Sequence, residues 1–427
     1  MEKRMLSVLV LVPVFLFSCS PREAGSLDER MQSILDRGIA RYGIHGVSAT
    51  VVFPDGTIWN GVSGVSHDAV NIAPDMVFAV GSITKNVVAA LTLKLVEDGI
   101  LSLEDPLSRW LPDYPHVDGR ITLRQLLNHT SGIYMYWNNQ DIWDALMADP
   151  ARVWPPEEVL GYIKEPHFRP GEGWAYSNTN YLLLAMILEK ATATSLPVLL
   201  RQRLFEPYGV APITLSQEDN TPENQAHIYG DDLMFGDGDK DTTFAPRAAH
   251  ESIGFGSNGI FTTSETLARW GHRLFGGKIL QPESLQAMME MVTFSPVANM
   301  RAYGLGVQEY DRQFSAGQRA IGHGGGNIGT SSHLVHFPDS NITIVVMINA
   351  FPNRGLGVIT RKLIRVVLRD LDVIGPFPYI DPARLKLPAS LFAVSLSIFL
   401  AAHWWKWRRK RREKPGLQVG ESRTSKS

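Results

Sequence analysis

The sequence predicts an α/β (α+β) protein in which a sheet is flanked by helices and a mostly helical lobe is inserted. Three observations lead to this fold class. Apolar alternation predicts a strand pair at 47–53 and 57–65, helical spacing dominates from about 100 to 210, and strand patterns return at 333–337 and 342–349. Strands on both sides of a helical stretch are typical of one sheet domain interrupted by a lobe.

The other elements follow in chain order. Helical spacing predicts helices at 27–42, 82–98, 181–191, 267–275 and 356–371, and a short strand is expected at 304–307. The strand pair turns at Pro54-Asp55-Gly56, and Gly99 is the residue type that usually follows a helix end. Thr262 and Glu265 have the spacing of a capping box before the fourth helix. The folded domain is expected to cover 30–372.

Composition excludes several classes of function. The 427 residues are 44% apolar, which is enough for one large core or two modest ones. A formal charge of −2 offers no basic surplus for nucleic acid. The single cysteine, Cys19, excludes an intramolecular disulfide and a cysteine-rich zinc site. The chain contains no phosphate loop, dinucleotide fingerprint or His-Glu-x-x-His motif, so we expect no cofactor and no metal.

The N-terminus has the layout of a secretory signal. A short basic start precedes an apolar run, and residues 1–18 are therefore expected to be a signal peptide. The run ends in Leu16-Phe17-Ser18-Cys19, which resembles a bacterial lipoprotein processing site and implies lipid attachment at Cys19. The alternative is a buried cysteine in an uncleaved anchor helix. Residues 19–29 would form a tether, and both readings export the domain that follows.

The C-terminus predicts a second membrane contact. A linker at 373–386 precedes an apolar segment at 387–407, long enough to span a bilayer, and a basic tail at 408–427. Trp404, Trp405 and Trp407 suit the headgroup region, and the arginines would stay in the cytoplasm. The alternative is an amphipathic helix on the membrane surface. The expected location is the bacterial cell envelope, with the domain outside the cytoplasm.

The candidate nucleophile is Ser82, at the start of the helix that ends at Asp98. Lys85 follows three residues later and so lies on the same side of the helix. The positive field of the helix N-terminus favours oxyanion charge, and burial would lower the lysine pKa until the amine could accept the serine proton. Alone, this spacing is also compatible with an ordinary helix cap and a solvated lysine.

Two further stretches give the Ser-x-x-Lys motif its context. Residues 168–178 contain Tyr176-x-Asn178 at a loop-to-helix junction, and residues 321–326 contain His323-Gly-Gly where an edge strand is expected. The order and separation of the three motifs resemble the serine β-lactamase and penicillin-binding-protein superfamily. The stretches 126–132 and 257–261 also resemble this superfamily. The likeness is closest to the branch of class C β-lactamases, D-aminopeptidases and family VIII esterases, and covers about 30–370. It implies a β-lactamase/transpeptidase-like antiparallel sheet.

The resemblance also implies a role for each motif residue. Ser82 would form an acyl-enzyme, with its proton shared between Lys85 and Tyr176, either of which is a candidate base. Asn178 would orient Lys85 and the substrate amide. The backbone N–H groups of Ser82 and Gly326 would form the oxyanion hole. Gly325 and its neighbours would leave a bare strand edge for an extended substrate.

Each of these residues also has a structural alternative. Tyr176 is compatible with an ordinary packed tyrosine, Asn178 with a helix cap, and the glycine run with a loop. The resemblance makes His323 a candidate substrate-binding residue, but it is also compatible with a structural histidine, or with a metal ligand alongside His333 and His336. Lysine is usual at the position of His323 in the β-lactamases, so recognition of a substrate carboxylate, and with it efficient β-lactam hydrolysis, is in doubt.

Two functions from different classes follow. The first is a membrane-tethered serine hydrolase acting on an amide or ester, such as a D-amino-acid peptide of cell-wall type or a small acyl ester. The second is a penicillin-recognition-like binding or regulatory protein without turnover, which the intact Ser82, Lys85 and Tyr176 disfavour. An aromatic group at Tyr134, Tyr136, Trp137 and Trp143 is compatible with either a pocket rim or lobe core.

Overall fold

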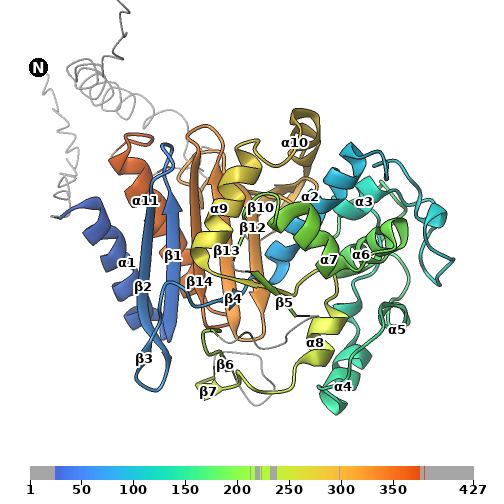
Figure 1. Ribbon diagram of the computed structural model, residues 1–427, viewed down its shortest axis with the longest axis horizontal. Coiled ribbons are helices and arrows are strands. Elements are labelled where there is room, and N and C mark those ends of the chain that lie inside the picture. Colours follow the sequence, from blue (N-terminus) through green and yellow to red (C-terminus); the bar gives the residue numbers. More distant parts are fainter. Residues whose placement is uncertain are drawn as a thin grey trace, which may run out of the picture. The chain divides into compact units, whose positions relative to one another are not determined.

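An antiparallel sheet of nine strands is the centre of the computed structural model, as far as its residues are described (Figure 1). The structure describes residues 25–211, 213–216, 222, 224–230, 238–297, 299–375 and 379. The strand order is β3-β2-β1-β14-β13-β12-β11-β10-β9. The strands are β1 (Gly46–Val52), β2 (Ile58–His67), β3 (Val70–Asn71), β9 (Val292–Val297), β10 (Met300–Tyr303), β11 (Gln308–Tyr310), β12 (Ile321–Asn327), β13 (Thr330–Phe337) and β14 (Ile342–Ile348).

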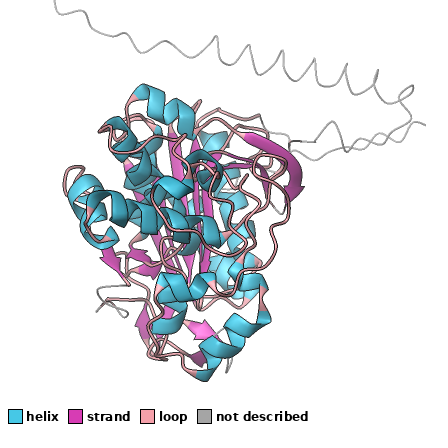
Figure 2. Ribbon diagram, turned by 90° about the vertical axis from the view of Figure 1, so that its right-hand side faces the viewer, coloured by secondary structure: helices cyan, strands magenta, loops and turns pink. Residues whose placement is uncertain are grey.

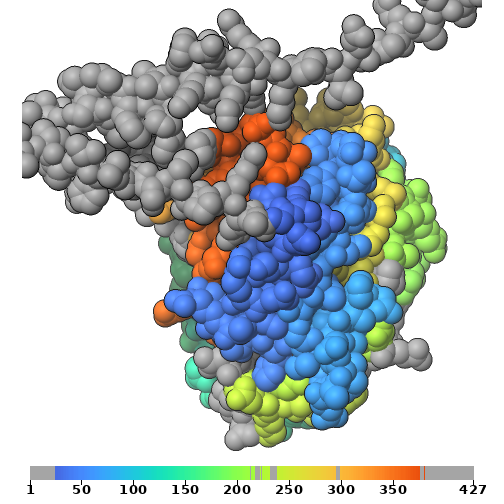
Figure 3. Space-filling view, turned by 90° about the vertical axis from the view of Figure 1, so that its left-hand side faces the viewer, coloured from blue at the N-terminus to red at the C-terminus, as the bar shows by residue number. Residues whose placement is uncertain are grey.

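Helices cover both faces of this sheet, because its central strands are apolar on both sides. Val346 and Ile348 of β14 pack toward α1 (Leu27–Tyr42) and α11 (Gly355–Asp370), whereas Val345 and Met347 join the core on the opposite face. Figure 3 shows α1 and α11 side by side on the outer face. On the other face α9 (Ser264–Phe275) packs against β1, β13 and β14. These helices and both hairpin strands confirm the sequence prediction.

The helical lobe lies beside the inner face of the sheet, and Figure 2 shows its helices in front of the strands. Its helices are α3 (Leu123–Leu127), α4 (Gln140–Ala148), α5 (Pro156–Leu160), α6 (Asn178–Thr192) and α7 (Leu196–Leu200). Two further helices follow in the described chain, α8 (Ala248–Ile253) and α10 (Pro282–Met288). One small sheet has the strand order β4 (Phe78–Ala79), β8 (Ile260–Thr262), β5 (Ile213–Leu215). A second pairs β6 (Tyr229–Gly230) with β7 (Lys240–Asp241). The lobe at about 100–210 is helical, as predicted.

The helix α2 (Thr84–Glu97) lies between the sheet and the lobe, after a 3-10 turn at Gly81–Ile83. The sequence predicted one buried face, but every residue from Thr84 to Leu93 is buried. Polar side chains are accommodated by internal hydrogen bonds: Asn86, for example, donates to the Gly306 carbonyl and accepts from the Trp270 indole. A helix surrounded by protein on all sides shows little amphipathic pattern.

Three local predictions differ from the structure. Gly304–Val307 is the turn between β10 and β11, not a strand, since the Gly304 N–H donates to the Val307 carbonyl. Thr263, not Thr262, caps α9, and its hydroxyl accepts from the Thr266 N–H. Residues 27–29, which the predictions assigned both to the tether and to the first helix, form the first turn of α1, because Ser26 and Glu29 make a capping box.

The two predicted membrane segments lie outside the described residues. The first is the signal at 1–18, followed by Cys19, and the second is the apolar segment 387–407, followed by the basic tail. Among the helices that are described, none alone has the length and apolar composition to cross a membrane. The pair Asn178–Thr192 and Leu196–Phe205 passes that test only together, with a bend of 79° between its members.

Candidate active site

Ser82 follows a segment that the sheets hold from two sides. The N–H of Val80 donates to the Ile260 carbonyl of β8 at 2.9 Å, and the Ser332 hydroxyl of β13 donates to the Val80 carbonyl at 2.9 Å. The chain then turns, and α2 begins at Thr84. Ser82 is therefore fixed at the N-terminal end of a buried helix, where unpaired N–H groups and the helix dipole favour negative charge.

Lys85 is fully buried beneath Ser82. Its Nζ lies 3.0 Å from the Ser82 Oγ and 3.0 Å from the backbone carbonyl oxygen of Ser257, to which it donates. Burial lowers the lysine pKa well below its ordinary value of 10.5, because removing an ammonium group from water disfavours the charged form. Lys85 is thus placed to act as a neutral amine beside the serine.

Tyr176 completes the arrangement from the loop before α6. The Lys85 Nζ lies 5.1 Å from the centroid of its ring. Burial raises the pKa of the Tyr176 phenol above its ordinary value of 10, and a hydrogen bond with the Ser82 side chain partly offsets this effect. The structure therefore brings Ser82, Lys85 and Tyr176 together, with the phenol in its protonated form.

The glycine stretch borders the same site, but β12 is not an edge strand as the sequence predicted. It lies between β13 and β11 in the sheet. β11 pairs only with Ile321 and Gly322, because the β10–β11 turn ends the ladder there. Gly324, Gly325 and Gly326 pair on one side with β13 and keep partial exposure. The open edge of β12 is thus a gap within the sheet, where three glycines have no pairing partner on the β11 side.

Glycine is required where this strand meets the nucleophile segment. A Cβ on Gly325 would lie 1.9 Å from the Val80 carbonyl oxygen, and one on Gly81, whose φ is +55°, would lie 2.6 Å from the Gly326 nitrogen. Real Cβ atoms do not approach other atoms so closely, so both positions exclude larger residues. The two backbones are therefore in direct contact, as the predicted oxyanion hole of Ser82 and Gly326 requires.

His323 is turned into the protein. Its Nδ1 lies 2.6 Å from the Gly324 carbonyl oxygen and must donate, so its Nε2 accepts from the Tyr303 hydroxyl at 2.8 Å. Burial lowers the His323 pKa to about 3. Both ring nitrogens are thus occupied and the ring is neutral. The predicted substrate-binding role is not supported, because the side chain has no free donor or positive charge to offer a carboxylate.

Asn178 lies at the first position of α6, two residues after Tyr176. Ser177 is the N-cap residue, so Asn178 is not the helix cap. Its Oδ1 is buried without a hydrogen-bond partner among the described residues, so it does not hold Lys85 as predicted. The Ser257 carbonyl contacts Lys85 instead. An unpaired buried acceptor next to Tyr176 is compatible with the other predicted role, contact with a substrate amide.

Sequence reasoning gave no role in the site to four of its aromatic neighbours. Tyr181 on α6 has its ring 5.7 Å from the Lys85 Nζ, and Tyr303 on β10 contacts His323. Both of these and Tyr136 are fully buried, as is His129. Two of them had a signal in the sequence: His129 lies in the stretch 126–132 that resembles the superfamily, and Tyr136 belongs to the aromatic group at 134–143. The aromatic group at 134–143 divides: Tyr136 is core, whereas Tyr134, Trp137 and Trp143 remain partly exposed.

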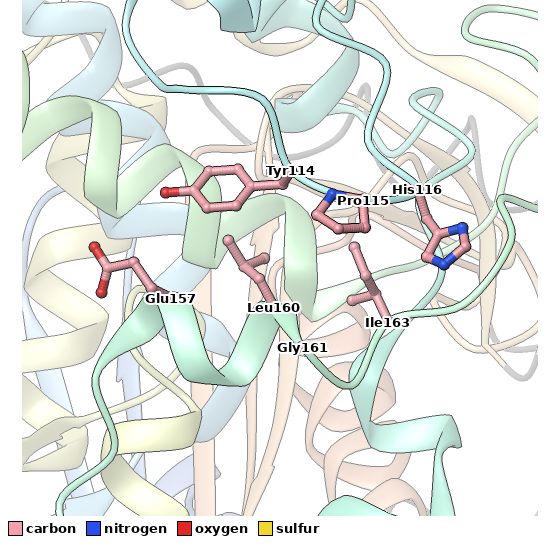
Figure 4. Close-up of a pocket in the computed structure, with 7 residues that line it drawn as sticks. All are labelled: Tyr114, Pro115, His116, Glu157, Leu160, Gly161 and Ile163. Carbon is pink, nitrogen blue, oxygen red and sulfur yellow. The ribbon is translucent and has the colours of Figure 1, made fainter.

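A separate surface pocket lies on the helical lobe (Figure 4). It has a volume of about 200 Å³ and is lined by Tyr114, Pro115, His116, Glu157, Leu160, Gly161 and Ile163. The Tyr114 hydroxyl and the Glu157 carboxylate lie near one end of the pocket, and His116 lies at the other. None of the predicted site residues borders it, so this pocket is not the site of the chemistry described above.

The fold and this grouping of serine, lysine and tyrosine are those expected for the β-lactamase and penicillin-binding-protein superfamily. The profile of the beta-lactamase family matches residues 31–369, and the chain belongs to that family. The predicted superfamily and fold class are therefore confirmed.

Three relatives show how wide the family is. Penicillin-binding protein 4* of Bacillus subtilis is 30% identical over 294 residues, covering 64% of this chain and 60% of that protein. A D-aminopeptidase of Brucella anthropi is 28% identical over 308 residues, covering 69% and 56%. The crystal structure of a D-stereospecific amidohydrolase from Streptomyces sp. superposes with a TM-score of 0.68 at 28% identity, covering 82% and 99%. The matched region thus spans little more than half the length of the two curated relatives.

Proposed function

We propose that this protein hydrolyses an amide or ester through an acyl-enzyme on Ser82. The observation that carries the proposal is the buried amine of Lys85, 3.0 Å from the serine oxygen and held by the Ser257 carbonyl. A lysine kept out of water loses its proton readily, and a neutral amine beside a hydroxyl is a general base. A purely structural lysine would instead pair with a carboxylate, and among the described residues Lys85 bonds the Ser82 hydroxyl and the Ser257 carbonyl but no carboxylate.

The proposed reaction proceeds in two steps. The Ser82 oxygen bonds to the acyl carbon as Lys85 takes its proton, and the backbone N–H groups of Ser82 and Gly326 stabilise the oxyanion. The bond to the leaving amine or alcohol then breaks, and the proton passes to that leaving group through the Tyr176 phenol. Water next attacks the acyl ester, releasing the acid and restoring the serine. The lowered pKa of Lys85 and the raised pKa of Tyr176 favour the lysine as base and the tyrosine as acid.

We propose D-aminoacyl amides and small acyl esters as the substrate class. Two kinds of relative, a D-aminopeptidase and a D-stereospecific amidohydrolase, bear names that support D-configured substrates. The neutral, fully bonded His323 disfavours substrates whose recognition depends on a free carboxylate, such as β-lactams and peptides ending in D-Ala-D-Ala. The open glycine edge of β12 suits an extended acyl chain.

A substrate panel tests this specificity. We expect p-nitrophenyl butyrate and D-alanine p-nitroanilide to be cleaved with higher kcat/KM than a chromogenic cephalosporin. A hydrogen bond to a charged group contributes about 1.5–3 kcal/mol, so its absence lowers kcat/KM for a carboxylate substrate by roughly 10- to 100-fold. L-Alanine p-nitroanilide is the matched control for configuration. Cephalosporin turnover equal to that of the anilide would contradict the proposed substrate class.

We further propose that the hydrolase is tethered outside the cytoplasm by a lipid on Cys19 and by the segment 387–407. The signal-like N-terminus and the apolar segment followed by a basic tail support this arrangement. Expressed in a bacterium, the mature chain should begin at Cys19 and carry the added mass of its acyl groups. A Cys19→Ser variant should lose that mass yet remain in the membrane fraction. Release of this variant into the soluble fraction would contradict the second anchor.

A further inference from the structure

We infer that His129 is a positioning residue that holds Tyr176 against Ser82. The inference rests on the proposed function, in which Tyr176 delivers a proton to the leaving group. His129 accepts hydrogen bonds from the backbone on both sides of the tyrosine. Its carbonyl oxygen accepts from the Ala175 N–H at 3.1 Å, and its ring Nδ1 accepts from the Ser177 N–H at 3.3 Å.

The tautomer of this histidine follows from its partners. A backbone N–H can only donate, so Nδ1 carries no proton and the proton of the neutral ring is on Nε2. The Asn180 side-chain nitrogen, 3.1 Å from Nδ1, is a second donor. Its orientation is fixed in turn, because the Asn180 Oδ1 accepts from the Ser131 hydroxyl at 2.7 Å. The acceptor that faces Ser177 is therefore the ring nitrogen, held in place by its own hydrogen-bond network.

Packing fixes the ring in the same position. The imidazole of His129 is 0% exposed, and its centroid lies 4.4 Å from the Tyr176 ring, 4.7 Å from the Tyr303 ring and 5.5 Å from the Tyr181 ring. Tyr303 is also the residue that bonds His323. His129 thus contacts the Tyr176 ring directly and accepts hydrogen bonds from the backbone N–H groups of the residues before and after it.

The position of Tyr176 depends on these hydrogen bonds and this ring contact because the tyrosine lies on a loop. Lys85 is placed by its own helix, three residues after Ser82, whereas Tyr176 comes from the segment between two parts of the lobe. In the described structure the His129 side chain bonds neither Ser82 nor Lys85, and its Nδ1 faces the Ser177 N–H. The hydrogen bonds that His129 does make to main-chain N–H groups go to the residues on either side of Tyr176, so we place its effect on Tyr176.

Two substitutions test the effect of the Nδ1 acceptor separately from the effect of the rest of the His129 ring. In His129→Asn the amide oxygen takes the place of Nδ1, whereas in His129→Gln the polar atoms reach only the place of Nε2. His129 has a φ of +64°, a left-handed conformation that asparagine tolerates well. Only the asparagine variant keeps an acceptor for the Ser177 N–H. The control is His336→Gln, since His336 is another buried histidine, bonded through Nδ1 to Thr343.

The readout exploits the need of a leaving group for a proton. Nitrophenolate leaves without one, whereas ethoxide requires one, so we compare p-nitrophenyl butyrate with ethyl butyrate, which have the same acyl group. Rates are expressed per active site, counted by fluorophosphonate labelling of the full chain. We expect His129→Gln to lower kcat/KM for ethyl butyrate on the order of 10- to 100-fold and to lower that for the nitrophenyl ester much less. His129→Asn should stay within about threefold of the wild type for both esters, and His336→Gln should not change the ratio.

Further outcomes decide between this role and its alternatives. In a Tyr176→Phe background, His129→Gln should add little to the loss, because a positioning residue has no effect without its partner. Equal losses on both esters, or equal losses in the asparagine and glutamine variants, would overturn the role. A wild-type chain that neither takes the fluorophosphonate label nor cleaves either ester would overturn the proposed function, and this role with it. A labelled wild type with a fully active His129→Gln variant would overturn the role alone.

Discussion

Replacing Ser82 with alanine is expected to abolish labelling by a fluorophosphonate or penicillin probe. It should also lower hydrolysis of p-nitrophenyl butyrate by at least about 10³-fold, as for other enzymes that lose their nucleophile. The reason is local: the Ser82 oxygen is the only atom of that side chain that can form the acyl bond, and it is the one that Lys85 and Tyr176 face. Mass spectrometry of the labelled chain and initial rates measure the two effects.

The matched control for this variant is Ser195→Ala. Ser195 also precedes a helix, but it is exposed and its side chain makes no capping bond. We expect it to be labelled and to react like the wild type. Both variants should keep the wild-type midpoint of thermal unfolding within a few degrees, because a partly exposed serine hydroxyl contributes about 1 kcal/mol at most. A Ser82→Ala chain that still forms an acyl-enzyme would contradict the assignment of the nucleophile.

Replacing Lys85 with methionine is expected to lower the acylation rate by about 10²- to 10⁴-fold, the usual contribution of a general base. Methionine keeps the apolar stem in its buried place and removes the amine. In the wild type, the pKa of Lys85 is lowered by burial, so its amine is neutral over a wider pH range than an exposed lysine. The rate should therefore fall as the pH is lowered through that pKa, since protonation removes the base. The pH profile of kcat/KM measures this limb.

The pH profile distinguishes catalytic loss from a folding defect. In Lys85→Met the low-pH limb that belongs to the lysine should disappear along with most of the rate. Lys190→Arg is the control, because Lys190 is an exposed residue near the end of α6 and should leave both rate and profile unchanged. A Lys85→Met enzyme with the wild-type rate and profile would leave Tyr176 as the base.

Motifs that lie on one element were predictable from the sequence. Ser82 and Lys85 lie three residues apart at the start of a helix, so their spacing predicted that the two side chains lie on the same side of it. Tyr176 could be assigned to the site only from the order of the three motifs along the chain. It lies 94 residues after Ser82, and no local pattern connects the two. The helices at both ends followed from periodicity, since their inward and outward faces differ. The β1–β2 hairpin was predictable because its turn residues, 54–56, separate two strand-like segments.

Features that depend on register or on backbone atoms were not predictable. The Ser257 carbonyl that holds Lys85 belongs to the main chain, so no residue type marks it. His323 was expected to face the substrate, but its direction depends on Tyr303, which the β10–β11 turn brings beside it. That turn also replaces the predicted strand at 304–307 and limits the pairing of β11 with β12. Long-range pairing of this kind leaves no signal in a single sequence.

The glycine gap in β12 has a consequence for how this scaffold changes its preferences over evolution. A ligand that hydrogen-bonds only to main-chain groups is bound whatever side chains the ligand carries. Selectivity must then come from the surrounding walls, for which Trp174 is a candidate because its ring lies 6.1 Å from the Tyr303 ring and stacks on Phe294 at 3.7 Å. Substitutions in these walls can therefore alter the range of accepted compounds while the reacting groups and their geometry stay the same.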